Sequence, residues 1–90
     1  MRLNGARILL TGAAGGLGSA LARRFAARGA RLGLVDLNPQ PLRSLCEELQ
    51  AGNGSVEGID ADLSRAEGRE AVVRWVERAW QGGVDVLVNN

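Results

Sequence analysis

Four short apolar runs divide this chain, and three longer stretches lie between them in which apolar residues recur every three or four positions. The short runs are almost continuously apolar, as is typical of parallel strands that are covered on both faces. We therefore expect strands at residues 6–11, 31–36, 55–60 and 84–89, of which the third is the weakest.

Three helices are expected between the strands, because the intervening apolar residues follow the period of an amphipathic helix. Right-handed crossovers then predict an α/β fold, namely a partial Rossmann-type doubly wound parallel sheet with the order β-α-β-α-β-α-β and strand order 3-2-1-4. The apolar positions are Leu17, Leu21 and Phe25, then Leu42, Leu45, Cys46 and Leu49, then Val72, Val73, Val76 and Trp80.

Residues that start and stop helices mark the ends of these stretches. Glycine is favoured just after a helix, and Ser, Asn and Pro are favoured at its beginning. We expect Trp75 and Trp80 to pack the third helix rather than to contact a substrate. The expected starts are Asn38 with Pro39 and a capping box from Ser64 to Glu67, and the expected stops are Gly29, Gly52 and Gly82-Gly83.

Composition narrows the class of protein. The 90 residues suit one domain with no second domain, and the net charge of +1 is spread along the chain, which argues against nucleic-acid binding. No apolar run approaches the roughly 18 residues of a membrane span. The single Cys46 and the absence of His leave no pattern for a disulfide or a metal site. We therefore expect a cytoplasmic protein that binds neither nucleic acid nor membranes.

Residues 11–18 read Thr-Gly-Ala-Ala-Gly-Gly-Leu-Gly, a glycine-rich turn between the first expected strand and the first helix. A pyrophosphate needs several N–H donors and a backbone that comes close to it, and a glycine turn at a helix N-terminus supplies both. In this interpretation Gly12 permits the sharp turn, Gly16 the close approach and Gly18 the tight packing of helix on strand. A glycine-rich connection that binds no ligand is the alternative.

Asp36 ends the second expected strand. A carboxylate there can accept hydrogen bonds from both hydroxyls of the adenosine ribose, and it repels a 2′-phosphate. A charge pair at about 4 Å is worth on the order of 4 kcal/mol at an effective dielectric constant near 20, which favours NAD over NADP. Its neighbours Val35 and Leu37 supply no Arg to reverse this preference. The alternative is that Asp36 only helps to cap the helix that follows Asn38.

Three motifs together resemble the short-chain dehydrogenase/reductase family: the glycine turn, Asp62-Leu63 after the third strand, and Val-Asp-Val-Leu-Val-Asn-Asn at residues 84–90. They occur in the family's order and spacing, and the ending favours this family over its epimerase-like branch. The resemblance implies that Leu17 lends a backbone amide to the pyrophosphate, that Asp62 accepts a hydrogen bond from the adenine amino group and that Leu63 flanks the ring. Asn89 and Asn90 would begin a turn that meets the ribose. The expected cofactor-binding residues are Gly12, Ala14, Gly15, Gly16, Leu17, Gly18, Asp36, Leu37, Asp62, Leu63, Asn89 and Asn90.

The catalytic residues of the family cannot be placed in this chain. The family uses a Tyr, a Lys four residues later, a Ser and an Asn, whereas this chain contains neither Tyr nor Lys. All its Ser residues precede the fourth strand, and Asn89 and Asn90 are not the family's catalytic Asn. We expect no catalytic residue here. The family pattern would continue with Ala-Gly, followed later by a Ser and a Tyr-x-x-x-Lys.

The sequence thus predicts the N-terminal half of a Rossmann NAD(P)-binding domain, from an NAD-dependent oxidoreductase of alcohols or carbonyl compounds that is expected to be a homo-oligomer. A non-catalytic nucleotide-binding or interaction module is the first alternative. A methyltransferase-like domain that binds S-adenosylmethionine is the second, and for Asp62 a solvated position near Ser64 remains open. For the 90 residues alone we expect the fourth strand to form an unpaired edge of the sheet, and we expect low solubility.

Overall fold

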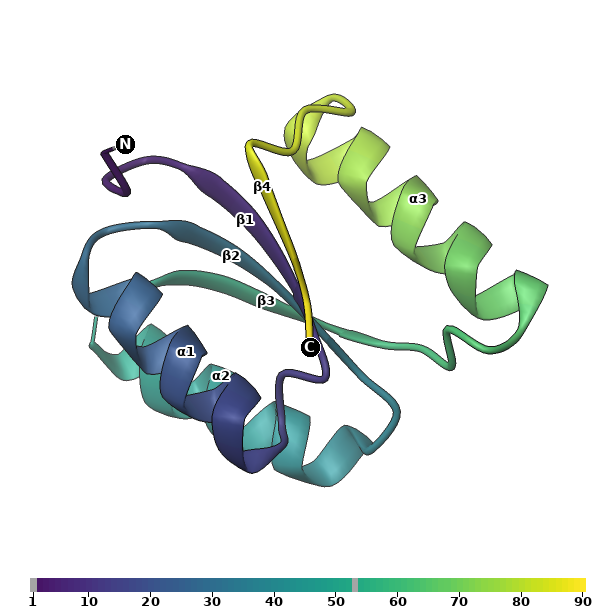
Figure 1. Cartoon of the computed structure of the whole chain (residues 1–90), viewed down its shortest axis with the longest axis horizontal. Coiled ribbons are helices and arrows are strands. Elements are labelled where there is room, and N and C mark those ends of the chain that lie inside the picture. The colour runs from purple at the N-terminus through teal and green to yellow at the C-terminus, as the bar shows by residue number, and fades with distance from the viewer. Residues whose placement is uncertain (1, 53) are drawn as a thin grey trace.

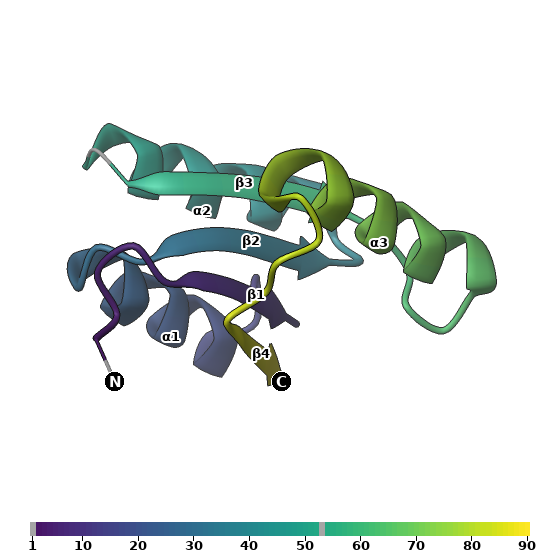
Figure 2. The same ribbon diagram turned by 90° about the horizontal axis from the view of Figure 1, so that it is seen from above.

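The computed structural model describes residues 2–52 and 54–90, which form one parallel sheet with helices on both faces (Figure 1). The strands lie in the order β3-β2-β1-β4, so the predicted fold class and strand order are confirmed (Figure 2). Helices α1 and α2 cover one face and α3 covers the other. The elements are β1 (Arg7–Thr11), α1 (Gly16–Ala27), β2 (Arg31–Asp36), α2 (Pro39–Ala51), β3 (Ser55–Asp60), α3 (Ala66–Trp80) and β4 (Val86–Asn89).

The central strand β2 is buried on both faces, because alternate side chains point into two separate apolar cores. Leu32 and Leu34 pack in the core under α1 and α2, whereas Val35 packs in the core under α3. Gly33 lies beneath the Trp75 ring, and a Cβ at this position would lie 2.6 Å from a ring carbon. Trp75 and Trp80 are 5% and 4% exposed, which confirms that both tryptophans pack the third helix.

The structure also confirms that α1 and α2 end next to the predicted glycines and that α2 begins after Asn38. Helix α1 ends at Ala27, and Gly29 follows with φ of +81°, a conformation that favours glycine. Helix α2 has Asn38 at its N-cap, ends at Ala51 and has Gly52 at its C-cap. Local propensity therefore decides where these helices begin and end.

The prediction of a capping box from Ser64 to Glu67 was wrong. Helix α3 begins at Ala66 with Arg65 at its N-cap, and Ser64 donates instead to Asp62 Oδ1, from its hydroxyl at 2.6 Å and from its amide at 3.0 Å. A charged acceptor two residues earlier forms a stronger hydrogen bond than a neutral cap, so the Ser64 side chain turns away from the helix.

The first and last strands are shorter than predicted: β1 begins at Arg7, and β4 begins at Val86 rather than at residue 84. The reason is Asp85, whose carboxylate accepts the Arg7 amide at 2.8 Å and two guanidinium N–H groups at 3.1 Å. The hydrogen bonds and charge of Arg7 lower the pKa of Asp85 to about 2. The Asp85 side chain therefore supplies the acceptor for the Arg7 amide, while one backbone bond, from the Asp85 amide to the Arg7 carbonyl at 2.9 Å, still joins the two segments here.

Cys46 is buried, as predicted, and burial raises the pKa of its thiol. In residues 2–52 and 54–90, no helix has the length and apolar character needed to cross a bilayer, and no three potential metal-ligating side chains come together.

The Arg7–Asp85 clamp predicts a pH-dependent stability. We expect Asp85→Asn to lower the urea midpoint at neutral pH, because the variant loses the ion pair and keeps the size of the side chain. The pKa of this carboxyl falls from 3.8 to about 2 on folding. Its contribution to stability is therefore complete above the unfolded pKa and is lost as the pH falls through the folded one.

Urea unfolding followed by circular dichroism at about pH 7 and about pH 2 tests this prediction. We expect the difference in urea midpoint between the unmodified protein and Asp85→Asn to be smaller at the lower pH. Glu67→Gln is the control, because it removes an exposed carboxylate that lies 3.7 Å from Arg65, and we expect little change. A difference in urea midpoint of the same size at both pH values would contradict the prediction.

Candidate functional site

The turn between β1 and α1 is built by a close backbone contact. Gly12 has φ of +63°, and a Cβ on Gly18 would lie 2.1 Å from the Gly12 carbonyl oxygen. Gly16 differs, because a Cβ there would meet nothing within 4 Å. The chain therefore needs glycine at positions 12 and 18 for its own packing, whereas the surface at Gly16 is open.

The first turn of α1 faces this open surface. Its N-cap is Gly15, and in the described ranges no side chain caps the helix. The first amides of an α-helix have no partner within the helix, and the helix dipole adds partial positive charge at this end. The arrangement presents N–H donors to an anion, with Leu17 beside them 64% exposed.

Asp36 ties the end of β2 to the glycine turn. Its Oδ2 accepts the Ala14 amide at 2.9 Å, and its Oδ1 accepts the Asn38 amide at 2.9 Å. The second bond agrees with the capping role that the sequence left open, and the first is a contact that the sequence did not reveal. Asp36 also pairs in register with Asp60 on β3, which places a second carboxylate at the same edge of the sheet.

The loop after β3 carries Asp62 and Leu63. Hydrogen bonds from the Ser64 hydroxyl and amide lower the pKa of Asp62, so the group is a carboxylate at neutral pH. Helix α3 packs closely under this loop, because a Cβ on Gly68 would lie 1.9 Å from the Asp62 carbonyl oxygen. Asp62 thus adopts the position near Ser64 that the sequence left open, and it remains an acceptor.

Asn89 and Asn90 are held by the end of β1. The Thr11 hydroxyl donates to Asn89 Oδ1 at 2.9 Å and accepts the Asn90 amide at 3.1 Å. The Asn90 side chain donates to the Gly12 carbonyl at 3.1 Å. These bonds bring the end of β4 against the glycine turn.

A groove of about 320 Å³ lies where these segments meet, beyond the carboxyl ends of the strands. Ligands of open α/β sheets bind at this edge, and this rule was the available signal for Thr11, Val35 and Ala61, which line the groove and were missed. The predicted residues that line it are Gly12, Asp36, Leu37, Leu63, Asn89 and Asn90. The predicted residues outside the lining are Ala14, Gly15, Gly16, Leu17, Gly18 and Asp62.

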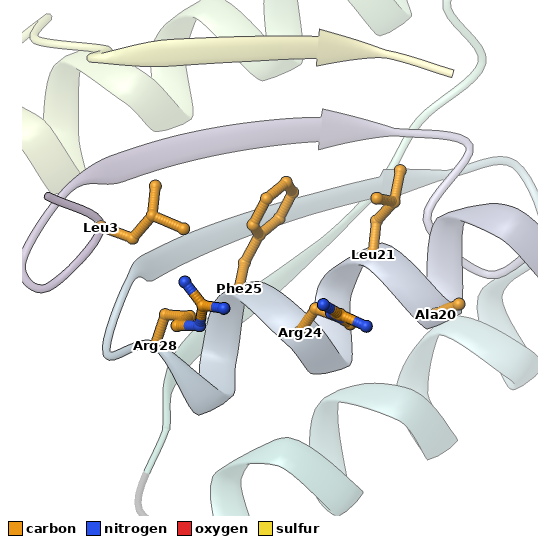
Figure 3. Close-up of a pocket in the computed structure, with 6 residues that line it drawn as sticks. All are labelled: Leu3, Ala20, Leu21, Arg24, Phe25 and Arg28. Atoms are coloured by element: carbon orange, nitrogen blue, oxygen red, sulfur yellow. The ribbon is translucent and has the colours of Figure 1, made fainter. Parts of the chain in front are cut away.

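A larger depression of about 410 Å³ lies along the flank of α1, away from these loops (Figure 3). Leu21 and Phe25 rise from α1 toward the sheet and Leu3 lies beside Phe25, with Arg24 and Arg28 at the outer side. This depression has an apolar floor and no converging acceptors. The groove at the strand ends is therefore the candidate site.

Known proteins are similar to this chain in sequence and in fold. The family model described as short chain dehydrogenase matches residues 6–90. D-threitol dehydrogenase of Mycolicibacterium smegmatis is 37% identical over 89 residues, which are 99% of this chain and 34% of that protein.

Two solved structures are also similar. L-sorbose reductase of Gluconobacter frateurii, in complex with NADPH and L-sorbose, has a TM-score of 0.91 and 33% identity over 100% of this chain and 35% of that chain. A short-chain dehydrogenase/reductase of Burkholderia phymatum, in complex with NAD, has a TM-score of 0.89 and 29% identity over 97% of this chain and 31% of that chain.

The 90 residues span about a third of the length of these relatives. The match nevertheless covers the glycine turn, the sheet and the ending at Asn90. By this match and by its strand order, the chain belongs to the short-chain dehydrogenase family.

Proposed function

We propose that these residues form the N-terminal half of a dinucleotide-binding domain in an NAD-dependent oxidoreductase, where they hold the adenosine and pyrophosphate of the cofactor. The observation that carries the proposal is the Asp36 carboxylate, which lines the groove and is bonded to the glycine turn through Ala14. One side chain thus links the two parts of the surface that a dinucleotide would occupy.

The pyrophosphate fits the first turn of α1. Its N-cap Gly15 has no side chain, so the amides of Gly16 and Leu17 face outward at the positive end of the helix dipole. The open surface at Gly16 allows a phosphate oxygen to approach the backbone. The Ala14 amide donates to Asp36 and so joins the glycine turn to the end of β2.

The adenosine fits between the ends of β2 and β3. The Asp36 carboxylate can accept from the ribose hydroxyls, because each oxygen has lone pairs beyond the single amide bond that it accepts. Leu37 and Leu63 line the groove as apolar walls for the adenine ring. Both Ser64 bonds to Asp62 end on Oδ1, so Oδ2 is the atom that would accept from the adenine amino group.

NAD is the preferred cofactor in this proposal. Relatives of known structure contain NAD or NADPH, so the preference rests on residues of this chain. The Asp36 carboxylate lines the groove and would repel a 2′-phosphate.

The substrate of the whole protein is proposed to be a small alcohol or carbonyl compound, by likeness to the dehydrogenases and reductases of the family. The nicotinamide, when bound, carries the hydride. This chain contains neither Tyr nor Lys, so its own contribution is to bind and orient the cofactor. A nucleotide-binding module without catalysis would use the same groove.

The cofactor preference is tested with Asp36→Ala. We expect NAD binding to weaken about tenfold to a hundredfold, because hydrogen bonds to a charged acceptor contribute about 1.5 to 3 kcal/mol. The affinity for NADP should fall less than the affinity for NAD, or should rise, so the preference for NAD over NADP becomes smaller. Isothermal titration calorimetry with both cofactors measures the two affinities.

Asp60→Ala is the matched control, because it removes the same charge from the neighbouring strand and Asp60 does not line the groove. We expect its NAD affinity to stay within about twofold of the unmodified protein, since an exposed charge is screened. Equal affinity of the unmodified protein for NAD and NADP would refute the assignment to Asp36.

The glycine turn gives a second prediction, which separates binding from folding. Gly16→Ala should keep the stability of the chain, because its Cβ meets no atom within 4 Å, and should weaken NAD binding about tenfold by obstructing the pyrophosphate. Gly18→Ala should instead lower stability by about 1 to 3 kcal/mol, because its Cβ would overlap the Gly12 carbonyl.

Urea unfolding and NAD titration of both variants distinguish these outcomes. If Gly16→Ala binds NAD as tightly as the unmodified protein, the pyrophosphate does not lie on the first turn of α1.

A further inference from the structure

Two carbonyl groups of the loop after β3 accept hydrogen bonds from the N-cap and the first turn of helix α3. The Asp62 carbonyl accepts the Arg65 amide at 3.2 Å, and the Leu63 carbonyl accepts Arg69 Nη1 at 3.0 Å. Gly68 has no side chain to separate the helix from the loop, since a Cβ there would lie 1.9 Å from the Asp62 oxygen. The first turn of α3 is therefore the support on which this loop rests.

The bond from Arg69 has a consequence for the carboxylate of Asp62. The Leu63 carbonyl and the Ser64 N–H belong to one planar trans peptide, so they point in opposite directions. Arg69 binds the carbonyl side of this peptide, and Asp62 Oδ1 accepts from the N–H side at 3.0 Å. Fixing the carbonyl therefore also fixes the donor that orients the carboxylate.

We propose that Arg69 is a positioning residue for adenine recognition, which acts through the Leu63–Ser64 peptide to aim Asp62 at the amino group of the base. The inference rests on the proposed dinucleotide site and adds a residue that lines no part of the groove. Arg69 contacts the loop from the helix side, and its effect on a ligand is exerted only through Asp62 and Leu63.

The chain offers a matched pair of substitutions. Arg69→Ala removes the bond to the Leu63 carbonyl. Arg74→Ala removes the same charge from the same helix, where Arg74 is exposed and lies 4.0 Å from Glu70. Arg69→Lys keeps the charge and one donor, so it should restore part of the effect.

The measurement compares NAD with nicotinamide hypoxanthine dinucleotide, which lacks the adenine amino group. The ratio of the two dissociation constants reports recognition of that group, and we expect about tenfold in favour of NAD for the unmodified protein. Arg69→Ala should reduce this ratio to about twofold, with Arg69→Lys between the two, whereas Arg74→Ala should leave it unchanged. Ligand-observed NMR or calorimetry gives both constants.

Each outcome has a defined meaning. If Arg69→Ala weakens both ligands by the same factor, Arg69 has only a structural role and the inference is overturned. If the unmodified protein binds both ligands equally, Asp62 does not recognise the amino group, and the inference fails while the dinucleotide site stands. If NAD does not bind at all, the proposed function itself fails.

Discussion

The close contact between Gly18 and Gly12 is the constraint on which the candidate site depends. The first turn of α1 lies against the turn that ends β1, and this packing leaves no space for a Cβ at position 18. The contact places the positive end of α1 next to the carboxyl ends of β1 and β2. Gly12 also lines the groove, and its carbonyl accepts the Asn90 side chain.

Three aspartates at the ends of strands and in loops accept backbone N–H groups with their carboxylates. Asp36 accepts the Ala14 and Asn38 amides, Asp62 accepts the Ser64 amide, and Asp85 accepts the Arg7 amide. A carboxylate forms a stronger hydrogen bond to a backbone N–H than a neutral acceptor does. A carboxylate side chain can also accept from backbone N–H groups that have no partner in the hydrogen-bond pattern of the sheet. One of these carboxylates, Asp36, lines the groove, so the group that ties the glycine turn to the end of β2 also gives the site negative charge.

The two edges of the sheet differ in chemistry. Strand β3 presents Glu57 and Asp60, which are exposed charges of the kind that discourage pairing with another chain. Strand β4 carries only apolar residues before Asn89, and Leu87 is 62% exposed. As the sequence predicts, β4 is an edge strand of the sheet that the described residues form, where it pairs with β1 along one side.

The sequence by itself determined the order and type of every element, the glycine turn and the strand ends at Asp36 and Asp60, because periodicity and turn residues act over a few positions. Tertiary structure decided the rest. The Ser64 hydroxyl donates to Asp62 instead of capping α3. The Asp85 carboxylate accepts the Arg7 amide, and β4 is shorter than predicted. Arg69 donates to the Leu63 carbonyl. The first and last of these are short-range contacts, but each depends on how α3 packs under the loop after β3. The Arg7–Asp85 clamp joins residues 78 positions apart, which are brought together only when β4 pairs with β1.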